Sequence, residues 1–139
     1  MRRGFEFENQ IKKVCGYINK SGGFAHKFCP ERTADGTYVR GEPFDYMVIT
    51  NSYKAVFDAK ECSGNKWSMR KKDIKQCNEL KKCKNAGFSA YFLILADKSR
   101  VITADVDEVI GELKKGCKTI HLDSLPEWDL LEKIRTGQV

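Results

Sequence analysis

The chain has 139 residues, enough to bury one hydrophobic core but not enough for an additional module. Its formal net charge of +6 favours a polyanionic partner, although ribosomal and membrane-surface proteins are also basic. No apolar run approaches the roughly 20 residues that span a bilayer, and the first predicted helix begins within a few residues of the start. We therefore expect one domain over residues 1–139, with no signal peptide and no membrane partner, in the cytoplasm.

The first element is predicted to be a helix over residues 5–19, because Phe7, Ile11 and Ile18 recur with helical spacing. Glu8 lies at the margin of this apolar stripe. Its carboxylate can complement the helix dipole at the first turn, or it can lean towards a site at the boundary of the core.

Two strands and a polar loop are expected next. A short strand covers residues 24–28, a polar loop covers residues 31–41, and a second strand covers residues 41–50. The loop carries Arg32 and Arg40, which would be available to the phosphates of a nucleic acid.

The third predicted strand carries the sequence Phe-Asp-Ala-Lys at residues 57–60. Because side chains alternate along a strand, Asp58 and Lys60 share a face with Val56. An acid and a base on an apolar strand are costly to bury unless they pair or bind a metal. Taken alone, the motif also fits an ordinary ion pair on an exposed edge strand.

A hairpin turn is predicted at Asn51-Ser52, and it could bring Asp45 beside Asp58. Two carboxylates can hold a divalent cation, and a neighbouring ammonium group can meet negative charge that develops in a reaction. The pattern therefore indicates metal-assisted hydrolysis.

A basic helix is predicted over residues 69–85, ended by Gly87. Gln76 lies in the middle of its apolar stripe, beside Cys77 and Leu80, where its amide needs a partner. It can be a structural hydrogen-bonding residue, or it can hold a phosphate or support a metal site. The rest of the helix is basic and only two acids dilute it: Arg70, Lys71, Lys72, Lys75, Lys81, Lys82 and Lys84, with Asp73 and Glu79.

The remaining chain supplies the scaffold. Its predicted elements are a buried strand over 89–95, a turn at Asp97-Lys98, a strand over 101–103, a helix over 106–115, a strand over 118–122 and a closing helix from Ser124. The six cysteines include no Cys-x-x-Cys pair, so we expect free thiols and no structural zinc.

Four blocks of the chain, in order between Gly4 and Leu95, resemble the PD-(D/E)xK nuclease superfamily, and within it the Holliday junction resolvases of the RecU and archaeal Hjc type. Phe44 stands where the family usually has proline, and Asp58 replaces the commoner glutamate. The blocks are Gly4-Phe5-Glu6-Phe7-Glu8, Phe44-Asp45, Phe57-Asp58-Ala59-Lys60-Glu61 and Lys75-Gln76.

The resemblance implies an α/β fold with a restriction-endonuclease-like αβββαβ core, in which helices flank a mixed central sheet. It implies that Asp45, Asp58 and the backbone carbonyl of Ala59 hold Mg²⁺, with Mn²⁺ as a substitute. Lys60 would stabilise the transition state or position the water. Glu8 and Gln76 would complete the catalytic set.

The resemblance also implies a partner, DNA with a four-way junction or another branch, and a homodimer that cuts two strands symmetrically. Trp128 and Leu131 are candidates for its interface or for the core. Other nucleases of the superfamily, acting on flaps, single strands or duplexes, remain alternatives, as does an inactive nucleic-acid-binding protein on the same fold. The predicted nucleic-acid-binding residues are Arg3, Arg32, Arg40, Lys66, Arg70, Lys71, Lys72 and Lys75.

Overall fold

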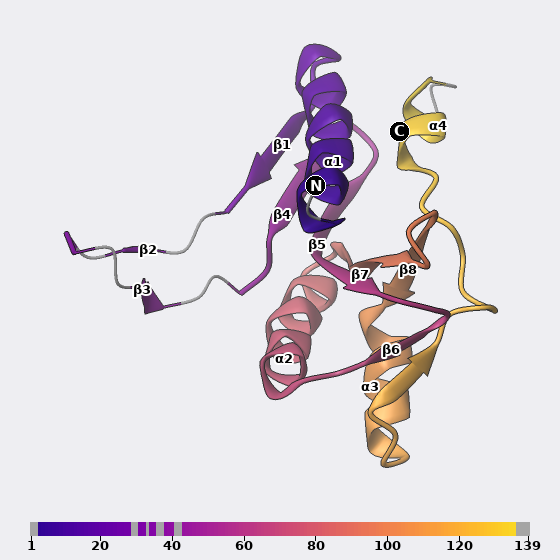
Figure 1. Ribbon diagram of the computed structural model, residues 1–139. Coiled ribbons are helices and arrows are strands. Elements are labelled where there is room, and N and C mark those ends of the chain that lie inside the picture. Colours follow the sequence, from indigo (N-terminus) through magenta and orange to yellow (C-terminus); the bar gives the residue numbers. More distant parts are fainter. Residues whose placement is uncertain (1–2, 29–30, 33, 36–37, 41–42, 136–139) are drawn as a thin grey trace.

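The computed structural model describes residues 3–28, 31–32, 34–35, 38–40 and 43–135. A five-stranded sheet lies at its centre, in the order β1-β4-β5-β7-β8 (Figure 1). These strands are β1 (Phe24–Lys27), β4 (Tyr46–Ile49), β5 (Lys54–Cys62), β7 (Ser89–Ala96) and β8 (Arg100–Asp105). The helices are α1 (Arg3–Lys20), α2 (Lys71–Asn85), α3 (Val106–Lys114) and α4 (Leu130–Arg135).

Two short strand pairs stand outside this sheet. They are β2 (Glu31–Arg32) with β3 (Tyr38–Arg40), and β6 (Lys66–Ser68) with β9 (Thr119–His121). In the central sheet β5 and β7 are parallel, and the other neighbouring strands are antiparallel. The sheet is therefore mixed and flanked by helices, as the sequence predicts.

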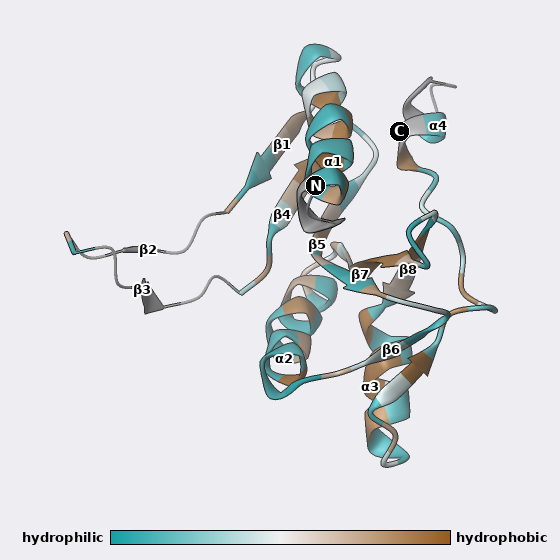
Figure 2. Ribbon diagram, in the orientation of Figure 1, coloured by the Kyte–Doolittle hydropathy of each residue, from teal (hydrophilic) through white to brown (hydrophobic). Residues whose placement is uncertain are grey.

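The two faces of the sheet are packed by different helices. On one face, Ile11 of α1 and Leu130 of α4 pack with Phe57 of β5. On the other face, Leu80 of α2 and Val109 of α3 belong to a second apolar cluster. Figure 2 shows α1 and α2 with hydrophobic and hydrophilic residues in alternation along their length, as one-sided packing requires.

Two helices begin later than the sequence predicts. α2 begins at Lys71 instead of residue 69, because Arg70 has an extended backbone, with φ of −101° and ψ of 170°, and is the N-cap. The closing helix begins at Leu130 instead of near Ser124. Its expected first turn lies against β8 instead, where the backbone N–H of Trp128 donates to the carbonyl of Val101.

The strands also depart from expectation in three places. Part of the polar segment over residues 31–41, expected as a loop, pairs as β2 and β3, and Figure 1 shows this pair extending away from the central sheet. β4 covers only the second half of the strand predicted over 41–50. β6 was not predicted, since three residues give too short a pattern to recognise.

Two further observations concern the cysteines and the helices. Cys15, Cys62, Cys77, Cys83 and Cys117 are free thiols, and Cys29 lies outside the described residues. In the part of the chain that the structure describes, no helix is long and apolar enough to cross a membrane.

Candidate active site

The β4–β5 hairpin places Asp45 against the middle of β5. The two strands are antiparallel, with Tyr46 opposite Phe57, so Asp45, immediately before the first residue of β4, lies next to Asp58. The backbone N–H of Ala59 donates a hydrogen bond to Asp45 Oδ2 at 3.0 Å. The juxtaposition predicted from the hairpin turn is therefore present.

Asp58 is almost completely buried, with 2% of its surface exposed. Burial, with the neighbouring charge of Asp45, raises the pKa of its carboxyl to about 6, and Lys60 offsets these effects only in part. Among the described residues, no hydrogen-bond donor reaches its Oδ1 atom. The pair of acids therefore carries more negative charge than the protein neutralises here.

Lys60 lies between two buried carboxylates. Its Nζ is 2.9 Å from Asp58 Oδ2 and 2.6 Å from Asp73 Oδ1. Burial by itself would lower the pKa of this lysine, but the charges and hydrogen bonds of the two aspartates outweigh burial and raise it. Lys60 is therefore an ammonium ion held in one place.

Asp73 is the site residue that the sequence reasoning missed, because it was counted among the charges on the exterior of the helix. It is 2% exposed, and its Oδ2 accepts a hydrogen bond from the backbone N–H of Arg70 at 2.8 Å. A signal was present in the sequence. Asp73 stands four residues after Met69 and four before Cys77, which places it on the buried stripe.

The donor atoms at this site fit a hard divalent cation. Within the described residues, no group of three or more His, Cys, Asp or Glu side chains could hold a metal ion, so a third protein ligand would come from the backbone. The N–H and C=O of one strand residue point to the same side of the strand. Since the N–H of Ala59 points to Asp45, its carbonyl does so too. Oxygen ligands of this kind suit Mg²⁺ or Mn²⁺.

Gln76 and Glu8, the other two predicted catalytic residues, come from helices on opposite faces of the sheet. Gln76 is half-buried, one helical turn after Asp73, and no described donor reaches its buried Oε1 atom. Glu8 belongs to α1, on the face of the sheet opposite Leu80 and α2. Its carboxylate is more than half exposed and pairs with Lys27 Nζ at 2.8 Å.

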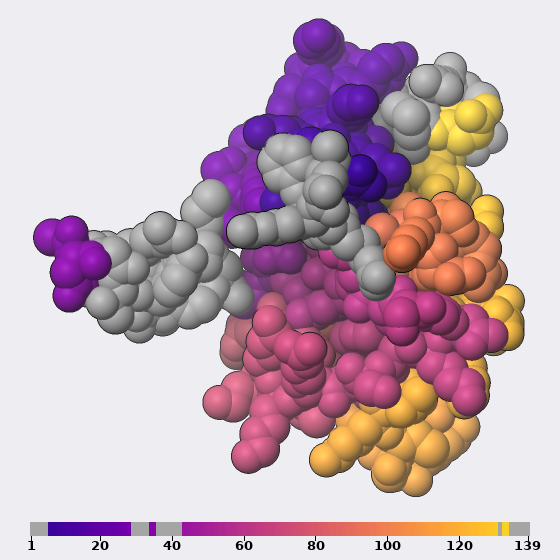
Figure 3. All heavy atoms as spheres, viewed as in Figure 1, coloured from indigo at the N-terminus to yellow at the C-terminus, as the bar shows by residue number. Residues whose placement is uncertain are grey.

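Several basic residues line a cavity that also includes Lys60. The cavity has a volume of about 530 Å³, and its lining includes Lys66, Arg70 and Lys72. Figure 3 shows the surface formed there by the segment after β5, in magenta, beside α2, in rose. Lys71 and Lys75 are exposed on α2.

Three of the predicted DNA-binding arginines are not placed by the structure. The side chains of Arg3, Arg32 and Arg40 lie outside the part of the chain that the structure describes. Their predicted role stays a prediction.

The class of protein is thus defined by an α/β fold in which Asp58 and Lys60 of β5 meet Asp45 from the neighbouring strand pair, in a mixed-sheet protein with an acid–lysine site. The chain belongs to the RecU family, since the family described as Recombination protein U matches residues 2–131. This confirms the family that the four sequence blocks indicate.

Comparison with solved structures finds several similar chains, one of which is described here. The structure of Hjc from Archaeoglobus fulgidus, described as a Holliday junction resolvase from an archaeal hyperthermophile, is 13% identical in sequence, with a TM-score of 0.48. The likeness covers 69% of this chain and 74% of that chain. No curated protein sequence matches the chain significantly.

Proposed function

We propose that this protein is a Mg²⁺-dependent endonuclease that hydrolyses phosphodiester bonds at Holliday junctions, and so acts in DNA recombination and repair. Membership of the RecU family supports a nuclease of this kind. The observation that carries the proposal is the state of the buried Asp58. Its Oδ1 accepts no hydrogen bond from the described residues, and a second carboxylate, that of Asp45, lies beside it.

Each residue of the site has a distinct task in this proposal. Asp45, Asp58 and the carbonyl of Ala59 would hold the cation, which supplies positive charge to the scissile phosphate and activates water. Lys60, anchored at the same face, meets the negative charge that develops on the phosphate. Gln76 would orient a group in the site through its buried amide oxygen.

The surface around the site suits a polyanion. Lys66, Arg70 and Lys72 line the cavity next to Lys60, where they can contact phosphates on either side of the cleaved bond. A four-way junction presents two equivalent strands, so we propose a two-fold symmetric homodimer of one nuclease domain per chain. With DNA as its substrate, the enzyme would act in the cytoplasm.

The proposal is tested by comparing cleavage of a four-way junction, a flap, a duplex and a single strand in Mg²⁺. We expect symmetric cuts in the junction and slower cleavage of the other three substrates. Preferential cleavage of the flap or the single strand would contradict the resolvase activity and indicate another nuclease activity. Binding to all four without any cleavage would indicate an inactive nucleic-acid-binding protein.

Asp45→Asn and Asp58→Asn should each abolish cleavage and leave junction binding intact or stronger. Each substitution removes a ligand of the cation, but neither removes an attraction for phosphate. Cleavage is measured by gel and binding by fluorescence anisotropy without Mg²⁺. Asp129→Asn, at an exposed position that pairs with Lys133 of α4, is the control and should cleave normally. Full activity in either of the first two variants would contradict the site.

A further inference from the structure

Asp73 joins two parts of the molecule through its two carboxylate oxygens. Oδ1 lies 2.6 Å from Lys60 Nζ on β5, and Oδ2 accepts the backbone N–H of Arg70 at 2.8 Å at the start of α2. Both Asp73 and the Asp58 side chain are about 2–3% exposed, and the Lys60 side chain is 12% exposed. Solvent therefore screens this link little.

Without Asp73, Lys60 would compete with the cation for the same carboxylate, that of Asp58. Its other partner is Asp58, 2.9 Å away, which is also the carboxylate that would hold the cation. An ammonium group paired with Asp58 alone competes with a cation for that carboxylate, and the cation in turn repels the ammonium group. Asp73 offers Lys60 a second carboxylate that the cation does not share.

We propose that Asp73 is a positioning residue, which anchors Lys60 beside the cation-binding pair and fixes it relative to the basic start of α2. The proposal rests on the proposed nuclease function. Through Asp73, the lysine that meets the scissile phosphate is joined to the backbone of Arg70, whose side chain and that of Lys72 line the adjacent cavity. A DNA strand bound at the start of α2 and the ammonium group of Lys60 are thereby held at a fixed distance from each other.

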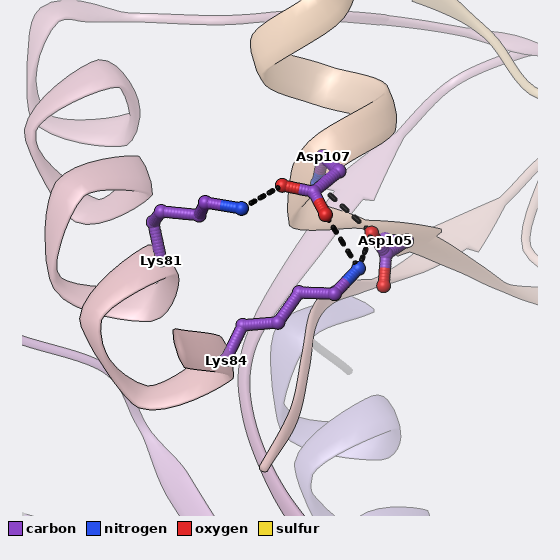
Figure 4. Close-up of polar contacts among 4 residues, drawn as sticks. All are labelled: Lys81, Lys84, Asp105 and Asp107. Atoms are coloured by element: carbon purple, nitrogen blue, oxygen red, sulfur yellow. Dashed lines mark hydrogen bonds and ion pairs between the residues drawn. The ribbon is translucent and has the colours of Figure 1, made fainter. Parts of the chain in front are cut away.

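A matched control exists at the other end of α2. Asp105 also caps a helix, since it accepts the backbone N–H of Asp107 at 2.9 Å, and it also pairs with a lysine, Lys84, at 2.6 Å (Figure 4). The two aspartates thus combine a helix cap with a lysine partner. Only Asp73 has the lysine of the candidate site as its partner.

The test compares Asp73→Ala with Asp105→Ala in single-turnover cleavage of the junction at saturating Mg²⁺, per folded molecule. We expect both variants to melt at a lower temperature. Asp73→Ala should cleave about ten- to a hundredfold more slowly with unchanged junction affinity, the scale of a small misplacement of a reacting group. Asp105→Ala should cleave at the normal rate.

A double-substitution cycle separates an effect through Lys60 from an effect through α2 as a whole. If Asp73 acts through Lys60, then Asp73→Ala has no further effect on the rate in a Lys60→Ala background. Independent, multiplying effects would overturn the proposal, as would a normal rate in Asp73→Ala. If Asp73→Ala does not fold, Asp73→Asn, which keeps one oxygen for the cap, takes its place in both comparisons.

A further measurement keeps this inference separate from the nuclease activity. Acetylation of lysines, followed by mass spectrometry, should modify Lys60 faster in Asp73→Ala than in the unsubstituted protein, while Lys66 reacts equally in both. If no DNA is cleaved but Lys60 becomes reactive, the proposed function fails and the anchoring role of Asp73 stands. If Lys60 reactivity is unchanged, the anchoring role fails, whatever the protein cleaves.

Discussion

At the scale of single residues, the site is a group of buried charges in which the acids are only partly neutralised by Lys60. Asp58 is removed from water and lies beside Asp45, and one lysine bond does not offset these two effects. A cation would supply the missing positive charge. This arrangement of charges therefore lowers the stability of the cation-free protein and becomes favourable when a cation is bound. Such a loss of stability is common at functional sites.

Asp58→Asn should change how the stability of the cation-free protein depends on pH. The pKa of Asp58 is about 6 in the folded state against an ordinary value of 3.8, so the folded state binds more protons between these values. The contribution of Asp58 to the free energy of unfolding is therefore greatest below pH 3.8, and it is lost as the pH rises through about 6. We expect Asp58→Asn to remove that loss in melting curves recorded in EDTA from pH 4 to 7.

The control for this experiment is Asp123→Asn, which removes an exposed carboxylate and should keep the pH dependence of the unsubstituted protein. Equal slopes of melting temperature against pH for Asp58→Asn and for the unsubstituted protein would show that Asp58 ionises normally. Lys60 would then offset both the burial of Asp58 and the neighbouring charge of Asp45.

At the scale of elements, α2 has two functional halves. Its first turns carry Asp73 towards the site and leave Lys71, Lys72 and Lys75 exposed, with no ion pair to any residue that the structure describes. Its last turns are neutralised. Lys81 Nζ lies 2.7 Å from Asp107 Oδ1. Figure 4 shows this contact beside that of Lys84. The excess of lysine along this helix is therefore a free positive charge only at the end near the site.

Replacing Lys71, Lys72 and Lys75 together by Ala should flatten the dependence of junction affinity on salt. If all three contact phosphates, the slope of log affinity against log salt falls by roughly 2–3 units. Anisotropy titrations from low to moderate salt measure this slope. The triple replacement of Lys81, Lys82 and Lys84 removes the same formal charge from paired lysines and should leave the slope nearly unchanged. Equal slopes for the two triple variants would mean that no such division exists.

At the scale of the whole molecule, two apolar clusters share the same sheet. β7 contributes Phe92 to the cluster under α2 and α3, and Leu93 to the cluster under α1. Both side chains are fully buried. Because neighbouring residues of one strand belong to opposite clusters, neither cluster can lose β7 while the other stays intact.

Phe92→Ala and Leu93→Ala should each lower the stability of the entire molecule. The loss should be about 3–5 kcal/mol for the phenylalanine and about 2–5 kcal/mol for the leucine, from lost burial and the cavity left behind. Unfolding is followed by far-ultraviolet and near-ultraviolet circular dichroism. The two signals should change together in each variant. Separate transitions would show that the two clusters unfold independently.

The sequence by itself determined the order of the elements and the main geometry of the acid pair. Periodicity located α1 and β7, and the alternation along β5 placed Asp58 and Lys60 on one face. These features were predictable because they depend on neighbours within one helix, one strand or one hairpin. Segments of two or three residues, such as β2 and β6, carry too little pattern to be found in this way.

Only the tertiary structure decided which charges are paired. Asp73, expected at the surface, is buried and is the second partner of Lys60. Lys84 is paired with Asp105. The tertiary structure also drew Trp128 into pairing with β8, which shortened the last helix. The partners in each case come from different elements. Their distance is set by how those elements pack on the sheet, and no periodicity within one segment encodes it.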